Sequence, residues 1–201
     1  MTYYSFQGLR PVVGADSYVH PTACLIGDVV IGQGCYIGAG AVLRGDMGRI
    51  TVGDGANVQD NCVVHGFPGR EMKIEDNAHV GHGAIIHGCH LGRNCFIGMN
   101  AVLMDDADIG ENSFIGAMSF VRAGLRIPSD SLAIGLPARV TRALTEDELA
   151  WKREATAVYH DLAAASLASL VECQPLSAIE AGRAQLSGGI APLGETRAAK
   201  A

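Results

Sequence analysis

Residues 91–127 read LGRNCFIGMNAVLMDDADIGENSFIGAMSFVRAGLRI, and an aliphatic residue returns at every sixth position from Leu91 to Ile127. A period of six fits neither the 3.6-residue repeat of an α-helix nor the strict alternation of a half-buried strand. It is the hexapeptide signature of a parallel β-helix, a coil in which three hexapeptides complete one triangular turn. The stretch therefore predicts an all-β repeat fold.

The same period extends back through most of the chain. Three extra residues interrupt it after Leu43, four interrupt it after Val64, and one residue is missing after Ile86. The series has 19 members, which predict about six turns and a parallel β-helix domain over residues 1–135. Its members are Val13, Val19, Leu25, Ile31, Ile37, Leu43, Val52, Val58, Val64, Ile74, Val80, Ile86, Leu91, Ile97, Leu103, Ile109, Ile115, Val121 and Ile127.

A second column of the repeat holds small side chains. Two positions before most of the aliphatic residues stands Ala, Ser or Cys, and four of the six cysteines occupy this column, namely Cys35, Cys62, Cys89 and Cys95. Small side chains suit the crowded interior of a narrow coil, where a free cysteine packs as a small apolar residue. We therefore expect reduced packing cysteines rather than a disulfide framework, a redox pair or a metal site.

A helix is predicted after the coil. Thr145 and Glu148 form the pattern of a capping box, so a helix should begin at residue 146, run to about residue 172 and close one end of the coil. A connector and this helix occupy residues 136–176, and a Gly- and Ala-rich tail, expected to be partly mobile, occupies residues 177–201. The apolar residues available for packing along the coil or on a neighbouring chain are Leu149, Trp151, Ala155, Val158, Leu162, Ala165 and Leu170.

The composition of the 201-residue chain narrows its partners. A formal net charge of −6 and the lack of a Lys/Arg run argue against nucleic acid or an anionic membrane as partner. No stretch approaches the roughly 18 consecutive apolar residues of a membrane span. The opening MTYYSFQGLRP lacks the basic and apolar segments of a signal peptide. We expect a cytoplasmic protein that acts on a small molecule.

Three histidines stand out through the stacking of the repeat. Val64 and Ile86 are three hexapeptide steps apart, so His65 and His87, which follow them, should stack about 4.8 Å apart on adjacent turns. Arg44 belongs to the same column, one turn earlier. His82 lies on a different face, so a single chain cannot bring all three imidazoles to one ion. In a cyclic trimer a head-to-tail interface can, with a fourth position left for water.

The other histidines, His20, His79, His90 and His160, show no comparable arrangement and are expected to be surface or packing residues.

Several motifs of the coil, taken in order, resemble those of the γ-class carbonic anhydrases over roughly residues 10–170. They are Arg44-Gly45-Asp46, Asn57-Val58-Gln59-Asp60-Asn61, Val64-His65, and Gly81-His82 followed four residues later by His87-Gly88. The resemblance implies a left-handed parallel β-helix and a homotrimer with Zn²⁺, or Fe²⁺ or Co²⁺, at each subunit interface. It also implies that His65 and His87 of one chain and His82 of its neighbour are the metal ligands.

The resemblance assigns further roles to polar residues near these ligands. Arg44 and Asp46 match an interface ion pair, with Asp60 in support. Gln59 and Asn57 match the polar residues around the metal-bound water. Tyr159, on the predicted helix, is similar to a tyrosine near the family's pocket.

Within this family the loop His65-Gly66-Phe67-Pro68-Gly69-Arg70 and the long tail resemble the branch of the phenylacetic acid degradation proteins, with the carnitine-operon proteins as its sister. This branch is associated with acyl-CoA catabolism and a thioesterase role. Arg70 is then a candidate residue for binding a phosphate of CoA, although an arginine at a loop tip is more often simply solvated. The long acidic loop of the family, whose glutamate shuttles protons, is missing here. The first insertion, residues 46–49, holds no glutamate, and the second insertion, residues 67–73, holds only Glu71.

The leading hypothesis is therefore a zinc-dependent enzyme whose metal hydroxide attacks an electrophilic carbonyl. Hydrolysis of an acyl-CoA thioester in phenylacetate catabolism comes first, and reversible hydration of carbon dioxide is the alternative. Two further hypotheses are a non-enzymatic trimeric accessory protein that keeps the metal as a staple, and a hexapeptide acyltransferase with His65 as general base.

Overall fold

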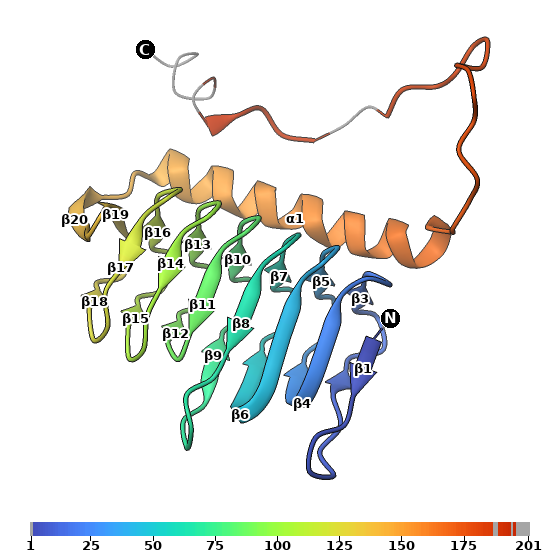
Figure 1. Ribbon diagram of the computed structural model, residues 1–201. Coiled ribbons are helices and arrows are strands. Elements are labelled where there is room, and N and C mark those ends of the chain that lie inside the picture. Colours follow the sequence, from blue (N-terminus) through green and yellow to red (C-terminus); the bar gives the residue numbers. More distant parts are fainter. Residues whose placement is uncertain (1, 187–188, 194, 196–201) are drawn as a thin grey trace.

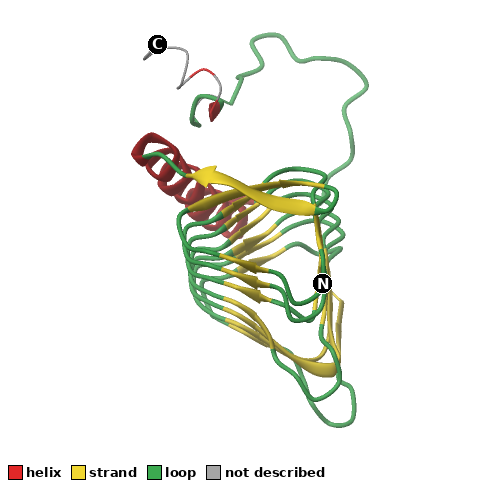
Figure 2. Cartoon of the chain, turned by 90° about the vertical axis from the view of Figure 1, so that its left-hand side faces the viewer, coloured by secondary structure: helices red, strands yellow, loops and turns green. Residues whose placement is uncertain are grey.

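A computed structural model of the chain describes residues 2–186, 189–193 and 195, and it shows a parallel β-helix followed by one long helix (Figure 1). Viewed from the end, the coil is three-sided (Figure 2). Each short strand pairs in parallel with the strand one turn away, as Val64 does with Ile86. The all-β repeat fold with a C-terminal helix is confirmed; its left-handed sense stays a prediction.

The strands form two hydrogen-bonded sheets that make up three faces. The first face, called the histidine face below, consists of β1 (Thr2–Tyr4), the first parts of β4 (Cys24–Ile31) and β6 (Val42–Val52), β8 (Val63–His65), β11 (Ile85–His87), β14 (Val102–Leu103) and β17 (Phe120–Val121). The second face consists of β2 (Val12–Val13), the last parts of β4 and β6, β9 (Met72–Ile74), β12 (His90–Leu91), β15 (Asp108–Ile109) and β18 (Arg126–Ile127).

The third face, called the helix face below, is a separate sheet that lies beside the long helix (Figure 1). It consists of β3 (Tyr18–Val19), β5 (Tyr36–Ile37), β7 (Asn57–Val58), β10 (His79–Val80), β13 (Phe96–Ile97), β16 (Phe114–Ile115), β19 (Ser131–Gly135) and the antiparallel β20 (Ala138–Ala143).

The core follows the predicted repeat. Every member of the aliphatic series from Val19 to Ile127 is buried, and so are the small residues of the second column, including its four cysteines. All six cysteines are free, and burial raises the pKa of Cys35 and of Cys62 to about 11. These thiols are therefore protonated packing groups at neutral pH, as the sequence predicted.

The coil is longer than predicted, with 7 parallel strands on each face and so about seven turns, where the sequence predicted about six. The two strands outside the predicted series are β1 at the start and β19 at the end. β19 contains Ala133, which lies six residues after Ile127 and is fully buried. An alanine at the aliphatic position ended the recognisable series, although the backbone continues in register.

The long helix α1 (Glu146–Ser169) begins as predicted. The Thr145 side chain accepts a hydrogen bond from the Glu148 backbone N–H, and the Glu148 carboxylate accepts one from the Thr145 backbone N–H at 2.8 Å. The helix ends three residues earlier than predicted, because Leu170 adopts an extended conformation.

The prediction that this helix closes one end of the coil is wrong. The helix runs along the length of the coil, beside the helix face (Figure 1). Its 24 residues make it about 36 Å long, whereas seven strands spaced about 4.8 Å apart span about 29 Å. The antiparallel hairpin of β19 and β20 covers the last turn instead, with Ser131 paired to Ala143.

The contact between α1 and the coil is more polar than predicted. Of the apolar residues proposed for packing, Ala155 is buried, whereas Leu162 and Leu170 are exposed. Lys152 is fully buried, and its ammonium group donates hydrogen bonds to the Asn94 side chain at 2.7 Å and to the Asn77 carbonyl. The Asn77 carbonyl and the Asn94 side-chain oxygen at the corners of the coil both need a hydrogen-bond donor at this position, and an apolar residue does not supply one.

No helix in the part of the chain that the structure describes is long and apolar enough to cross a membrane. The expectation of a partly mobile tail concerns residues 177–201, of which 187–188, 194 and 196–201 lie outside the described residues. Within the tail, the Ala191 carbonyl accepts a hydrogen bond from the Trp151 indole at 2.9 Å.

Candidate functional site

The predicted column of Arg44, His65 and His87 is present on the histidine face. The three residues lie on neighbouring strands, with Arg44 in register with His65 and His65 in register with His87. The two imidazole centroids are 5.1 Å apart, and His65 Nδ1 lies 3.1 Å from His87 Nε2. The stacking inferred from the repeat is confirmed.

Each imidazole of this pair has its other nitrogen on a carboxylate. His65 Nε2 lies 3.1 Å from Asp46 Oδ1, and His87 Nδ1 lies 2.7 Å from Asp105 Oδ1. Burial alone would raise the pKa of Asp46, but hydrogen bonds from Arg44 and His65 outweigh burial, so the pKa is lowered. The Arg44 guanidinium reaches Asp46 Oδ2 at 3.1 Å within the same chain. That this ion pair also borders a subunit interface stays a prediction.

The facing nitrogens of His65 and His87 suit a cation when each ring carries its single proton on the outer nitrogen. A neutral imidazole has one N–H, and each ring has a carboxylate beside its outer nitrogen to accept it. The two facing nitrogens then both present lone pairs at 3.1 Å. Bonds of 2.0–2.1 Å to a tetrahedral zinc ion place two nitrogens about 3.3 Å apart. Carboxylates that hold the second nitrogen are also typical of metal-bound histidines. The donor set therefore fits a metal ion.

Asp105 was missed by the sequence analysis. It lies at a corner of the turn after His87, and its carboxylate occupies the space that a side chain at Gly88 would fill. The sequence signal for this contact is His87-Gly88 followed one turn later by an aspartate. Asp105 lies at a corner, outside the column of stacked residues that contains the histidines, so the stacking of that column does not indicate it.

His82 is separated from the pair, as the repeat predicted. It follows β10 on the helix face, its side chain is half-exposed, and its Nδ1 lies 3.2 Å from Asp60 Oδ2. Among the residues that the structure describes, no three His, Cys, Asp or Glu side chains of one chain form a group that could hold a metal ion. A site with all three histidines would therefore need a second copy of the chain.

Gln59 and Asn57 are buried in a hydrogen-bonded network with His79. The Gln59 amide donates to Asn57 Oδ1 at 3.0 Å and to His79 Nε2 at 2.6 Å, and its carbonyl accepts from the His82 backbone N–H at 3.2 Å. These three buried side chains are called the Gln59 network below. The expectation that His79 is an ordinary packing residue overlooked these contacts, because it considered only the column of His65 and His87.

Tyr159 joins this network from α1. Its ring packs edge-on against His79, with 5.2 Å between centroids, and against Tyr36 at 5.4 Å. Burial, together with Tyr36 and Asp60, raises the pKa of Tyr159 to about 12. The phenol is therefore protonated near neutral pH and can donate a hydrogen bond, but it is not a base.

The charged residues Arg70 and Glu71 of the second insertion, residues 67–73, are paired locally. Arg70 forms an ion pair with Asp106, and the Glu71 carboxylate accepts a hydrogen bond from the Thr51 hydroxyl. The charge of Arg70 is thereby offset, which weakens its candidacy for a CoA phosphate. The pairing of Glu71 likewise leaves it poorly suited to shuttle protons.

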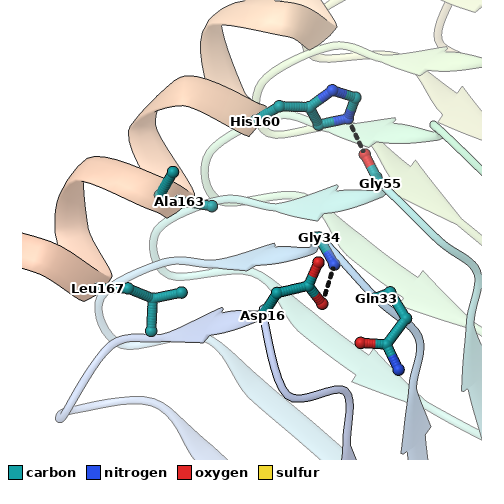
Figure 3. A pocket seen from close by; sticks show the side chains of 8 residues that line it. Asp16, Gln33, Gly34, Gly55, His160, Ala163 and Leu167 are labelled. Atoms are coloured by element: carbon teal, nitrogen blue, oxygen red, sulfur yellow. Dashed lines mark hydrogen bonds between the residues drawn. The ribbon is translucent and has the colours of Figure 1, made fainter.

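The other predicted packing histidines have local partners. His90 is held on both ring nitrogens, by Asp108 at 2.8 Å and Glu75 at 3.2 Å. His160 donates to the Gly55 carbonyl at 2.9 Å and lines a groove of about 370 Å³ between α1 and the first corners of the coil (Figure 3). Asp16, Gln33 and Leu167 line the same groove, which contains none of the candidate site residues.

Comparison with known proteins places the coil among hexapeptide repeats. The family model described as bacterial transferase hexapeptide (six repeats) matches residues 10–45, 71–103 and 88–123. A model described as the hexapeptide repeat of succinyl-transferase matches residues 28–65. The carnitine operon protein CaiE of Citrobacter koseri is 53% identical over 188 residues, which cover 94% of this chain and 95% of that protein.

Solved structures give the same relationship. A hexapeptide transferase family protein from Anaplasma phagocytophilum is 36% identical with a TM-score of 0.78, over 81% of this chain and 96% of that chain. A variant of perosamine N-acetyltransferase from Caulobacter crescentus, in complex with CoA and GDP-perosamine, is 27% identical with a TM-score of 0.55, over 65% of this chain and 57% of that chain. The γ-carbonic anhydrase features and the phenylacetate branch stay predictions.

Proposed function

Since the chain belongs to the hexapeptide-repeat family and, within it, to the relatives of the carnitine operon protein CaiE, we propose that it is a homotrimeric, metal-dependent hydrolase of acyl-CoA thioesters. The observation that carries the proposal is the pair of nitrogens, His65 Nδ1 and His87 Nε2, which face each other at 3.1 Å while carboxylates hold the outer nitrogens of both rings.

His65 and His87 of one chain and His82 of its neighbour would hold the ion, which we propose to be zinc, with iron or cobalt as alternatives. When held by three imidazoles, zinc supplies Lewis acidity and lowers the pKa of water to about 7. The chain's own contribution is orientation. Asp46, Asp105 and Asp60 each hold one nitrogen of a ligand ring and so fix which nitrogen is offered.

The surface beside the imidazole pair supports a trimer. The apolar residues Val63 and Ile85 point outward from the strands that carry His65 and His87. Val63 is 37% exposed and Ile85 is 42% exposed. Met99, one turn after His82 on the other half of the site, is 54% exposed. A head-to-tail ring would bring these two apolar borders together and bury both.

Two observations favour a thioester over carbon dioxide as substrate. The only glutamate of the second insertion, Glu71, is engaged by Thr51, so the loops beside the site offer no free glutamate for rapid proton export. A related solved structure, that of the perosamine N-acetyltransferase variant, is a complex with CoA. The resemblance to the phenylacetate branch adds an aryl-acyl group as the first candidate. Hydration of carbon dioxide is the alternative reaction.

A hexapeptide acyltransferase is the second candidate. The matching family models describe transferases, and His65 held by Asp46 has the arrangement of an oriented general base. This alternative requires no metal ion, so the two candidates differ in their response to a chelator. A trimeric accessory protein, in which the ion only joins subunits, would bind metal without turnover.

The experiment is a parallel assay of one zinc-loaded preparation. Release of free CoA from phenylacetyl-CoA and aliphatic CoA esters is measured beside carbon dioxide hydration, for the wild type, His87→Ala and His90→Ala. His90 also has two carboxylate partners but lies on the second face, so it is a matched control. We expect thioester hydrolysis that chelator and His87→Ala abolish and His90→Ala preserves. Carbon dioxide hydration without thioester hydrolysis would make hydration the preferred activity. Chelator-insensitive transfer of the acyl group to an added acceptor would favour the acyltransferase.

A further inference from the structure

The outward side chains of the helix face form a ladder that α1 partly covers. Register pairs connect its rungs in the order Tyr18, Tyr36, Asn57, His79, Phe96, Phe114 and Leu132. Five rungs are aromatic or aliphatic, and the two adjacent polar ones are Asn57 and His79. Both of these bond to Gln59, which lies two residues after Asn57. The Asn57 amide nitrogen also lies 3.3 Å from His79 Nδ1. The interruption of an otherwise apolar ladder therefore coincides with the contacts to Gln59.

His79 is held rigidly as a neutral ring. It stacks on Phe96 at 4.7 Å with an interplanar angle of 28°, meets Tyr159 edge-on and is only 6% exposed. Burial, with smaller effects of the Lys152 and His82 charges, lowers the pKa of His79 to about 3. The imidazole consequently carries a single proton at neutral pH.

The position of that proton follows from the neighbouring backbone. The His82 backbone N–H can only donate, so the Gln59 oxygen, 3.2 Å away, is the acceptor. The nitrogen of the Gln59 amide then supplies both of its hydrogens, one to Asn57 Oδ1 and one to His79 Nε2. The Asn57 amide nitrogen also faces the ring, 3.3 Å from Nδ1, but a neutral imidazole can accept only one of these two donors. The much shorter 2.6 Å contact from Gln59 assigns the lone pair to His79 Nε2 and the ring proton to Nδ1.

We infer that His79 is a positioning residue that, through Gln59, turns both amide hydrogens inward and leaves the second lone pair of the Gln59 carbonyl oxygen as the one part of this amide that can bond to a reacting molecule. This inference rests on the proposed function for its catalytic meaning. A carbonyl oxygen accepts a hydrogen bond from an attacking water but cannot donate one to the oxygen of an acyl group. Gln59 accordingly orients the nucleophile and does not form part of an oxyanion hole.

Two substitutions separate positioning from packing. His79→Phe keeps a ring against Phe96 and Tyr159 but removes the acceptor of the Gln59 amide. His79→Gln places a side-chain oxygen near the position of Nε2 and so restores that acceptor. In the holoenzyme we expect His79→Phe to lower kcat about 10- to 100-fold with KM changed less than about twofold, at unchanged metal content and trimer mass. His79→Gln should return kcat to within about threefold of the wild type. A wild-type kcat in His79→Phe, or equal losses in both variants, would overturn the inference.

A second readout does not depend on activity. Nitrogen-15 NMR of the histidine-labelled trimer at pH 7 reports which ring nitrogen carries the proton, and His79→Phe identifies the signal. We expect His79 as the Nδ1–H tautomer. An Nε2–H tautomer would overturn the inference even in an active enzyme. Failure of the proposed function would instead appear as a wild type without turnover that still shows the Nδ1–H form.

Discussion

His65 Nδ1 and His87 Nε2 lie 3.1 Å apart, and each ring has a carboxylate on its opposite nitrogen. Without a shared proton or a cation, this geometry sets two lone pairs against each other. The hexapeptide repeat produces it directly, because residues three hexapeptides apart stack on adjacent turns, and a second copy of the chain is needed only for the third ligand.

The carboxylate of Asp105 should contribute to metal affinity. Asp105→Asn keeps an oxygen near His87 Nδ1 but removes the negative charge that increases the basicity of the ring, so we expect zinc affinity to fall about 10- to 100-fold. Competition with a chromophoric chelator measures it. Asp108→Asn, which alters the corresponding partner of His90 on another face, is the control. Equal affinity of the wild type and Asp105→Asn would exclude a supporting role for this carboxylate.

The buried Lys152 should make stability depend on pH. Burial lowers its pKa from 10.5 to about 8, so below pH 8 the folded state carries a charge that it holds less well than the unfolded chain does. This penalty is relieved as the pH rises from 8 towards 10.5. Relative to Lys152→Met, the wild type should therefore gain stability over that interval, by about 3 kcal/mol at most.

Urea unfolding at pH 7, 8, 9 and 10, followed by the fluorescence of Trp151, provides the measurement. The difference between the two proteins removes most of the contribution of the buried cysteines, which they share. Parallel curves at all four pH values would mean that Lys152 titrates as an ordinary exposed lysine.

The ion pair between Arg142 and Glu148 should stabilise the start of α1. Glu148 is 1% exposed and accepts two hydrogen bonds of 2.8 Å from the Arg142 guanidinium. Arg142→Ala leaves this carboxylate buried with fewer donors, and we expect a loss of about 2 kcal/mol in the free energy of unfolding. Arg139→Ala, an exposed arginine on the same strand, is the charge-matched control and should lose less than about 0.5 kcal/mol. Equal losses would attribute the effect to net charge.

Periodicity alone predicted the coil, its core and the stacking of His65 on His87, because a six-residue repeat fixes which side chains superpose. Periodicity failed where the residue at the repeat position has a small side chain, and where a contact joins residues far apart in the sequence. Ala133 continues the core but is not recognisable as an aliphatic position, so the last strand of the coil was missed.

The position of α1 along the coil, rather than at its end, depends on long-range contacts such as Lys152 with Asn94, which no local pattern predicts. The participation of His79 in the Gln59 network was missed for a related reason. His79 lies in register with Asn57, but its functional contact is diagonal, to a residue at the end of the neighbouring strand.

The most direct test of the central claim is the metal content of mixed trimers. His82→Ala chains keep the imidazole pair and lack the third ligand, whereas His87→Ala chains lack the pair and keep His82. Each variant alone should bind no zinc at the site.

In a head-to-tail ring that contains both variants, one of the three junctions combines an intact pair with an intact His82. Trimers carrying both of two different tags are purified, and their zinc is measured. We predict about one zinc ion per mixed trimer and almost none in either parent. Zinc retained by His82→Ala alone, or none in the mixed trimers, would contradict a metal site shared between subunits.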